Sequence, residues 1–312
     1  MADGAEVGRR AVLTVVPLLL EDGRCVATTA IVAAGGRGQR FGSAVPKQLL
    51  DVGGRALLDR SVSALLAHPA IDAVVVALPA ELVADPPPYL RVSAKPLRLV
   101  AGGGRRQDSV ANAFAVIADD VDVVLVHDAA RPFASDGLIT RSIIAAAEFG
   151  AAVTAVASRD TVKHGSSDGF VQQTLPREHI YLAQTPQTFR REVLRDALAL
   201  AGSGTEATDE ASLAERAGYR VKLVDGEAAN IKITVPEDIH VAEALAGAST
   251  MAPGLDDPGW RVGIAARDER DIAALVGSSV PLVNRHAASL DEHLVSSVQA
   301  RTLASVQDQD SH

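Results

Sequence analysis

The chain has 312 residues, of which 47% are hydrophobic, and its formal net charge is -9 at pH 7. This length can bury a large core, in one large domain or two smaller ones. The acidic balance argues against a general nucleic-acid-binding protein, so an anionic ligand would need a local basic pocket. The single cysteine, Cys25, excludes a disulfide framework within the chain and fits a reducing cytoplasm.

Residues 1–27 look only faintly like a targeting signal. Arg9 and Arg10 precede an apolar run, but Pro17 and the acidic pair Glu21 and Asp22 interrupt it, and no cleavage site of small residues follows. The run is also too short to cross a membrane. We interpret residues 1–27 as an N-terminal extension or an extra strand, and we expect no membrane partner.

A glycine-rich loop follows the first predicted strand, residues 29–34. Backbone N–H groups of such a loop can converge on an anion, and arginine or lysine adds charge where phosphate oxygens would lie. The loop lacks the Gly-Lys-Ser/Thr of a Walker A motif, and Phe41 stands where a dinucleotide fingerprint has its third glycine. The glycines alone leave an ordinary turn and a phosphate site both open. The like charges in this loop repel one another unless an anion binds there, so their presence favours a triphosphate site. The loop contains Gly35, Gly36, Gly38 and Gly42, with Arg37, Arg40 and Lys47.

A second strand–glycine–helix unit begins at the predicted strand 98–101. Three glycines separate this strand from a helix predicted over residues 106–118. The backbone at Gly103 could pass close to a flat base, and Ser109 could donate a hydrogen bond to it. The alternative is an ordinary helix start in which Arg105 and Arg106 are solvated.

A carboxylate follows the next predicted strand, residues 122–126. Ligands of parallel α/β sheets bind at the carboxyl ends of the strands. Magnesium takes one or two carboxylates together with phosphate oxygens and several waters. Asp128 is therefore a candidate Mg²⁺ ligand, whereas His127, with no Cys or His cluster near it in sequence, is interpreted as structural.

Residues 158–189 depart from the alternating pattern around them. They are polar, contain turn glycines and include short β-type runs, so we interpret them as a hairpin arm of the kind that packs on a partner subunit. Within the arm, residues 159–161 and 184–187 (Gln-Thr-Pro-Gln) are more specific than a plain linker requires.

Further along the chain, Thr208 and Lys232 are two more candidate site residues. Thr208 or Asp209 is expected to cap a helix that ends at Gly218. Lys232 lies between two isoleucines on a short strand predicted over residues 230–234. Both a surface lysine and a phosphate-binding lysine are compatible with that pattern.

Strand and helix patterns alternate over residues 29–245, which predicts an α/β protein. We expect a three-layer, Rossmann-like fold with a mostly parallel sheet and a protruding β-arm. The domain is predicted to span residues 28–246, and residues 247–312 to form a linker and a C-terminal extension without assigned chemistry. The other helices are expected over 57–66, 136–149, 191–200 and from Pro236, and the other strands over 72–78, 151–157 and 221–224.

Seven motifs in order resemble the 2-C-methyl-D-erythritol 4-phosphate cytidylyltransferase family of the non-mevalonate isoprenoid pathway, over about residues 28–246. Together they are specific, although each alone would be weak. They read A-A-G-G-R-G-Q-R-F-G with P-K-Q-L, G-G-x-R-R-x-D-S-V, H-D-A-A-R-P-F, S-R-D-T-V-K, Q-T-P-Q-T-F, T-D-E-A-S and N-I-K-I-T-x-P-E-D.

The resemblance implies a nucleotidyltransferase that moves a cytidylyl group from CTP to 2-C-methyl-D-erythritol 4-phosphate and releases pyrophosphate. It implies that Arg40 and Lys47 stabilise charge on the triphosphate and that Asp128 binds Mg²⁺. It further implies a homodimer in which the arm exchanges, so that Arg159 serves the partner's site. The acceptor phosphate would be held by Arg159 and Lys232 with Thr208 and Arg131 nearby, and CTP would be lined by Ala33, Ala34, Gly35, Gly36, Gly103 and Ser109.

The sequence departs from the family pattern in its first loop, which is one residue longer than the usual A-A-G-x-G-x-R. Either Gly36 or Arg37 is the additional residue, so Arg37 has no assigned role. Two alternatives stay open: a ribitol 5-phosphate cytidylyltransferase, which shares the paired cations, and a catalytically silent nucleotide-binding regulatory protein.

Overall fold

The structure is a computed structural model that describes residues 25–36 and 46–251. The predictions made for residues 1–24, for Arg37 and Arg40, and for the tail from residue 252 onward lie outside the described residues. Contacts divide the chain into Met1–Ala252 and Pro253–His312, and every described residue belongs to the first unit.

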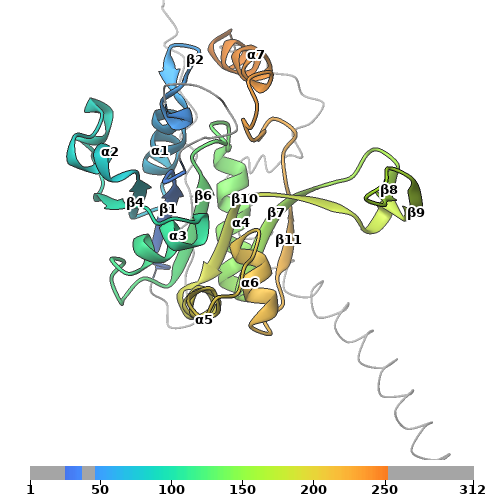
Figure 1. The fold of residues 1–312 in the computed structure, drawn as a ribbon. Coiled ribbons are helices and arrows are strands. Elements are labelled where there is room, and N and C mark those ends of the chain that lie inside the picture. Colours follow the sequence, from blue (N-terminus) through green and yellow to red (C-terminus); the bar gives the residue numbers. More distant parts are fainter. Residues whose placement is uncertain (1–24, 37–45, 252–312) are drawn as a thin grey trace, which may run out of the picture. The chain divides into compact units, whose positions relative to one another are not determined.

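A seven-stranded sheet forms the centre of this unit, in the order β11-β7-β10-β6-β1-β4-β5 (Figure 1). Strand β10 runs antiparallel to both of its neighbours, and the other pairs in the sheet are parallel. The mostly parallel sheet is therefore confirmed. The strands are β1 Thr28–Ala33, β4 Ala73–Leu78, β5 Leu97–Ala101, β6 Val123–Asp128, β7 Ala151–Ala157, β10 Tyr181–Arg190 and β11 Lys222–Asp225.

Helices cover both faces of the sheet, because each central strand is apolar on both sides. In β1, Val32 packs into the core on one face and Ile31 into the core on the other. Helices α1 and α4 contribute to the first core, and α3, α5 and α6 to the second. This arrangement confirms the three-layer α/β fold. The helices are α1 Leu57–Ala67, α2 Ala80–Ala84, α3 Arg106–Phe114, α4 Asp136–Phe149, α5 Arg191–Gly202, α6 Glu210–Arg216 and α7 Asp238–Met251.

Helix ends follow their local capping chemistry. The Ser135 side chain accepts a hydrogen bond from Leu138 N at the start of α4, and Gly150, with φ +90°, ends that helix as predicted. Asp209 caps α6 by accepting from Ser212 N. Helix α3 ends at Phe114, earlier than the predicted end at residue 118. The chain there tightens into i to i+3 bonds, such as Ile117 N to Phe114 O.

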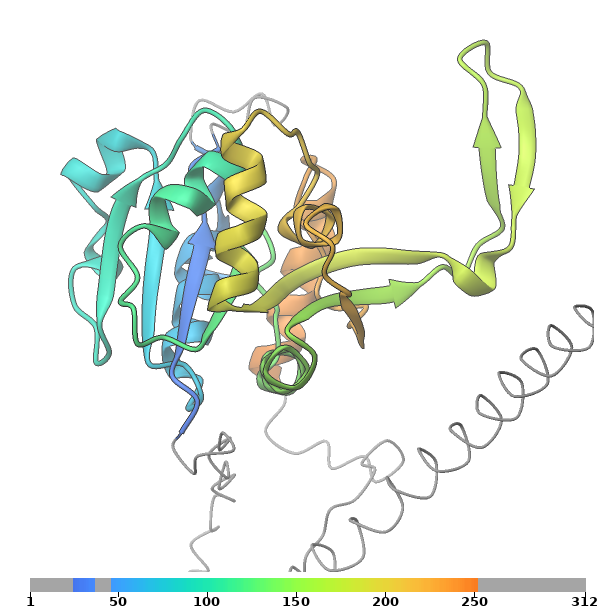
Figure 2. The same ribbon diagram turned by 90° about the horizontal axis from the view of Figure 1, so that it is seen from below.

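The arm is real but shorter than predicted. Strands β8 (Val162–Gly165) and β9 (Val171–Leu175) form a two-stranded hairpin that stands away from the sheet (Figure 2). The predicted end of the arm at residue 189 is wrong, because β10 returns into the sheet between β7 and β6. The polar Gln-Thr-Pro-Gln run at residues 184–187 belongs to β10, in which residues 184–189 are all buried.

The segment that contains Lys232 is not a strand, contrary to the prediction for residues 230–234. It has no regular secondary structure, and its Ile233 N donates to Ala130 O. Ile233 packs with Ala242 and Ala246 of α7 and with Val52, between the short strands β2 (Asp51–Val52) and β3 (Arg55–Ala56) and the helix. Helix α7 runs from Asp238 to Met251, past residue 246, where the predicted domain ends. No helix among the described residues is long and apolar enough to cross a membrane.

Candidate active site

The two glycine-rich loops meet at the carboxyl ends of β1 and β5. A Cβ at Gly35 would lie 2.7 Å from Ser109 Oγ, and a Cβ at Gly102 would lie 2.9 Å from the Cα of Gly35. Real Cβ atoms essentially never lie this close to another non-bonded atom, so both positions need glycine because the loops touch. Ala34 anchors the first loop, since its N–H donates to Ala77 O.

Ser109 shapes the second loop from within. Its Oγ accepts a hydrogen bond from Gly103 N at 3.0 Å and donates to Arg105 O at 3.2 Å. A Cβ at Gly103 would lie 2.3 Å from the Cβ of Asp108, so the loop folds tightly over the start of α3. Gly103 and Ser109 therefore lie together, and the predicted contact of each with a base stays a prediction.

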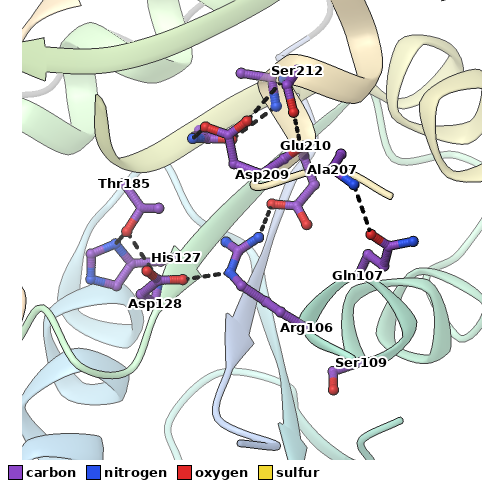
Figure 3. A network of polar contacts seen from close by, with 12 residues as sticks. Arg106, Gln107, Ser109, His127, Asp128, Thr185, Ala207, Asp209, Glu210 and Ser212 are labelled. Atoms are coloured by element: carbon purple, nitrogen blue, oxygen red, sulfur yellow. Dashed lines mark hydrogen bonds and ion pairs between the residues drawn. The ribbon is translucent and has the colours of Figure 1, made fainter. Parts of the chain in front are cut away.

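Asp128 lies at the end of β6 between two cations. Its Oδ1 accepts from Arg106 Nε at 2.8 Å, and its Oδ2 lies 2.7 Å from Lys232 Nζ (Figure 3 shows the Arg106 contact). Burial opposes ionisation of this carboxyl, but the charges of Arg106 and Lys232 outweigh it, so its pKa lies well below the ordinary value. Asp128 is therefore ionised. The side chain of its partner Lys232 is 43% exposed, so the ion pair reaches the protein surface.

Arg106 also pairs with a second carboxylate. Its NH1 group donates to Glu210 Oε2 at 2.5 Å, and the Glu210 side chain is 0% exposed (Figure 3). Burial raises the pKa of Glu210, and the charge of Arg106 opposes that rise. The interpretation of Arg105 and Arg106 as a solvated pair is wrong for Arg106. Arg105 is exposed and pairs with Asp108.

The segment before Lys232 is held from several sides. Arg131 is buried, and its guanidinium donates to the carbonyls of Asn230 at 2.8 Å and Ala183 at 3.3 Å. Asn230, 0% exposed, donates from Nδ2 to Thr185 O at 2.8 Å. Arg131 thus fixes the backbone that presents Lys232. Its Nε has no hydrogen-bond partner within the described residues, and its predicted contact with the acceptor stays a prediction.

His127 is structural, as expected. Its Nε2 lies 2.9 Å from Arg131 O, a carbonyl that can only accept, so Nε2 carries the ring proton. In the neutral ring Nδ1 is then an acceptor, so Thr185 Oγ1, which accepts from Asp128 N at 3.0 Å, donates to Nδ1 at 3.0 Å. Burial lowers the pKa of His127 to about 4, so the ring is neutral near pH 7.

Three other predicted residues are described by the structure: Lys47, Thr208 and Arg159. Lys47 opens the short 3-10 turn Lys47–Leu49 that leads into β2. Thr208 is exposed and directly precedes the cap of α6. Arg159 is exposed at the start of the arm, and within residues 25–36 and 46–251 no hydrogen bond or ion pair joins its side chain to Asp128 or Lys232.

No direct sign in the sequence marks Arg106 and Glu210 as partners. They are 104 positions apart and meet only because α3 and α6 lie on the same face of the sheet. One indirect sign existed, since each belongs to a motif that also contains a candidate site residue: Arg106 precedes Ser109, and Glu210 follows Thr208.

The donor atoms around Asp128 can be compared with what a divalent cation needs. Within the described residues there is no group of three or more His, Cys, Asp and Glu side chains that could hold a metal by itself. Asp128 nevertheless fits Mg²⁺ bound chiefly through substrate phosphates, which needs only one protein carboxylate. One of its oxygens is shared with the half-exposed Lys232 and not with a buried group.

A sequence profile of the 2-C-methyl-D-erythritol 4-phosphate cytidylyltransferase family matches residues 28–247. An enzyme of that name from Pelotomaculum thermopropionicum is 44% identical over 225 residues, which is 69% of this chain and 92% of the relative. The crystal structure of the enzyme of that name from Thermus thermophilus is similar with a TM-score of 0.60 and 39% identity, covering 71% of this chain and 100% of that one.

A protein named Bifunctional enzyme IspD/IspF from Anaeromyxobacter dehalogenans is 51% identical over 219 residues. The match covers 69% of this chain and 56% of that protein, so the chain spans about half the length of such bifunctional relatives. The profile, the relatives and the solved structure all point to one family. The chain belongs to the 2-C-methyl-D-erythritol 4-phosphate cytidylyltransferase family and is a nucleotidyltransferase.

Proposed function

We propose that this chain transfers a cytidylyl group from CTP to 2-C-methyl-D-erythritol 4-phosphate and releases pyrophosphate, in isoprenoid precursor biosynthesis. The observation that carries the proposal is the Asp128–Lys232 pair at the carboxyl edge of the sheet. The two glycine-rich loops, which touch each other, follow β1 and β5 at this same edge of the sheet.

The reaction joins two anions. A phosphate oxygen of the acceptor attacks the α-phosphorus of CTP, and the bond from that phosphorus to the bridging oxygen of the β-phosphate breaks, so pyrophosphate leaves with the electron pair. Two unit charges roughly 4 Å apart repel by about 4 kcal/mol at an effective dielectric of about 20. Fixed cations on both reactants offset this repulsion and hold the reactants in line, so no covalent nucleophile is needed.

We assign the cations to the two reactants by their position in the family motifs. Arg40 and Lys47 stabilise the triphosphate as charge moves to the leaving group. Lys232 and Arg159 bind the acceptor phosphate, with Thr208 and Arg131 nearby. The CTP site is formed by Ala33, Ala34, Gly35, Gly36, Gly103 and Ser109.

Asp128 would hold the Mg²⁺ ion that accompanies CTP. When bound, this ion neutralises charge on the triphosphate oxygens. Arg106 holds Oδ1 of Asp128 in place, so Oδ2 is the oxygen that faces Lys232 and the site.

We further propose that the enzyme is a cytoplasmic homodimer whose arms exchange, so that Arg159 reaches the partner's site. Apolar side chains on the arm support a protein partner: Phe170 is 72% exposed and Val171 is 62% exposed. The domain is proposed to span residues 28–246, with the flanking segments outside it.

The proposal is tested by incubating the full chain with CTP, Mg²⁺ and one acceptor at a time, and following pyrophosphate. We expect release with 2-C-methyl-D-erythritol 4-phosphate and little with ribitol 5-phosphate. The opposite preference would favour the ribitol enzyme. CTP binding with no release for either acceptor would favour a silent nucleotide-binding protein.

A further inference from the structure

The four residues Gln184, Thr185, Pro186 and Gln187 form a bulge in β10, called here the β10 bulge. Ala183 pairs with Ala155 of β7 and Gln187 with Val153, so four steps along β10 match two steps along β7. The side chains of Gln184, Thr185 and Gln187 are 7%, 3% and 1% exposed. Buried polar side chains must find partners, and these three find them on three different segments.

Thr185 binds the segment that contains Asp128. Its hydroxyl accepts from Asp128 N and donates to His127 Nδ1 (Figure 3). One side chain thereby fixes the backbone of Asp128 and the ring of the preceding histidine. Through that ring it also reaches the carbonyl of Arg131.

Gln184 binds the segment that leads to Lys232. Its Nε2 donates to Glu227 O at 2.9 Å, and its Oε1 accepts from Glu227 N and from Asn230 Nδ2, both at 3.2 Å. A Cβ at Gly226 would lie 2.7 Å from that oxygen, so the contact also explains a glycine there.

Gln187 binds the start of α6, next to Thr208. Its Nε2 donates to Asp209 Oδ2 at 2.8 Å, and its Oε1 accepts from Ala211 N at 3.0 Å. These two contacts flank Glu210, the buried partner of Arg106. Gln187 therefore sets both the cap of α6 and the residue that completes the Asp128 network.

We propose that Thr185, Gln184 and Gln187 are positioning residues that hold the three walls of the site at one spacing: Asp128, the Lys232 segment and the Thr208 segment. This inference rests on the proposed function, because it concerns the same site. A purely local bulge would need no contacts with three distant segments.

The strand itself offers a matched control. Thr188 is 0% exposed and lies on the same strand beyond Thr185, but its hydroxyl bonds with Ser142 of α4, at 2.5 Å. Thr185→Val and Thr188→Val each remove one buried hydroxyl at nearly constant volume, so both should lower the melting temperature. Only Thr185 touches a wall of the site.

The test compares steady-state kinetics of the two valine variants with CTP and the erythritol phosphate. We expect kcat to fall about 10- to 100-fold in Thr185→Val, since a misplacement of about 1 Å has effects of that size. Thr188→Val should keep kcat within about twofold, and Thr185→Ser, which retains the hydroxyl, should restore most of the activity. Gln187→Leu should raise the acceptor KM more than the CTP KM.

Equal kinetic losses in Thr185→Val and Thr188→Val, in proportion to lost stability, would overturn the inference. Crystal structures of the same two variants decide it without activity: Asp128 and its contact with Lys232 should shift in Thr185→Val only. If the wild-type chain transfers no cytidylyl group, the proposed function fails, and the crystallographic comparison still judges the positioning role.

Discussion

Lys232 Nζ lies 2.7 Å from Asp128 Oδ2, so the lysine assigned to the acceptor phosphate is already paired with the carboxylate assigned to Mg²⁺. The pair explains how a partly exposed lysine is held in one place before substrates arrive. It also links the two halves of the site, because a cation that binds Asp128 changes the strength of the ion pair between Asp128 and Lys232. Arg106 occupies the other oxygen of Asp128 and keeps the carboxylate oriented.

Removing Arg106 alone is expected to destabilise the fold. Arg106→Met leaves Glu210, with its fully buried side chain, without its cation and removes one partner of Asp128. Breaking a buried ion pair costs about 3–5 kcal/mol, and we expect about 3 kcal/mol because 28% of the Arg106 side chain is exposed. Denaturant unfolding at pH 7 measures this cost.

The double variant Arg106→Met with Glu210→Met separates stability from catalysis. It removes the unpaired carboxylate, so much of the stability should return, whereas turnover should stay low because Asp128 is no longer oriented. A loss below about 1 kcal/mol in Arg106→Met, within the range of an exposed pair, would contradict the buried network.

Gly102→Ala should separate the two glycine loops. The new Cβ would lie 2.9 Å from Gly35 Cα, a backbone atom that cannot rotate away. We expect a loss of about 1–3 kcal/mol in stability and a raised KM for CTP. Gly104→Ala is the matched control, since its Cβ would meet its nearest neighbour, Asp108 Oδ2, only at 4.0 Å. Similar CTP kinetics in both variants would refute the role of loop contact.

Arm exchange can be tested by mixing two variants that each bind the acceptor weakly, assayed well below their acceptor KM. If Arg159 serves the partner's site, a dimer of Arg159→Ala with Lys232→Ala has one site with both residues intact. Refolding an equal mixture should restore about one quarter of wild-type activity, because half the dimers are mixed and each has one intact site. A mixture no more active than either variant alone would place Arg159 and Lys232 in the same chain's site.

The layers of the fold were predictable because apolar patterning is local. Strand β1 lies close to the apolar run predicted over residues 29–34, and helix α4 ends before Gly150, as predicted. Strand β10 was missed because Gln184, Thr185 and Gln187 are buried by hydrogen bonds to distant segments, which no local pattern reveals. The Arg106–Glu210 pair was missed for the same reason. By contrast, Asp128 followed from its place at a strand end.

The most direct measurement is acceptor saturation in Lys232→Ala at saturating CTP. Losing one charge-assisted contact of about 1.5–3 kcal/mol should raise the acceptor KM by roughly 10- to 100-fold and leave the CTP KM close to wild type. Lys222→Ala, which changes an exposed lysine on β11, is the control and should behave as wild type. An unchanged acceptor KM in Lys232→Ala would contradict the assignment of this lysine, and with it the account of the site.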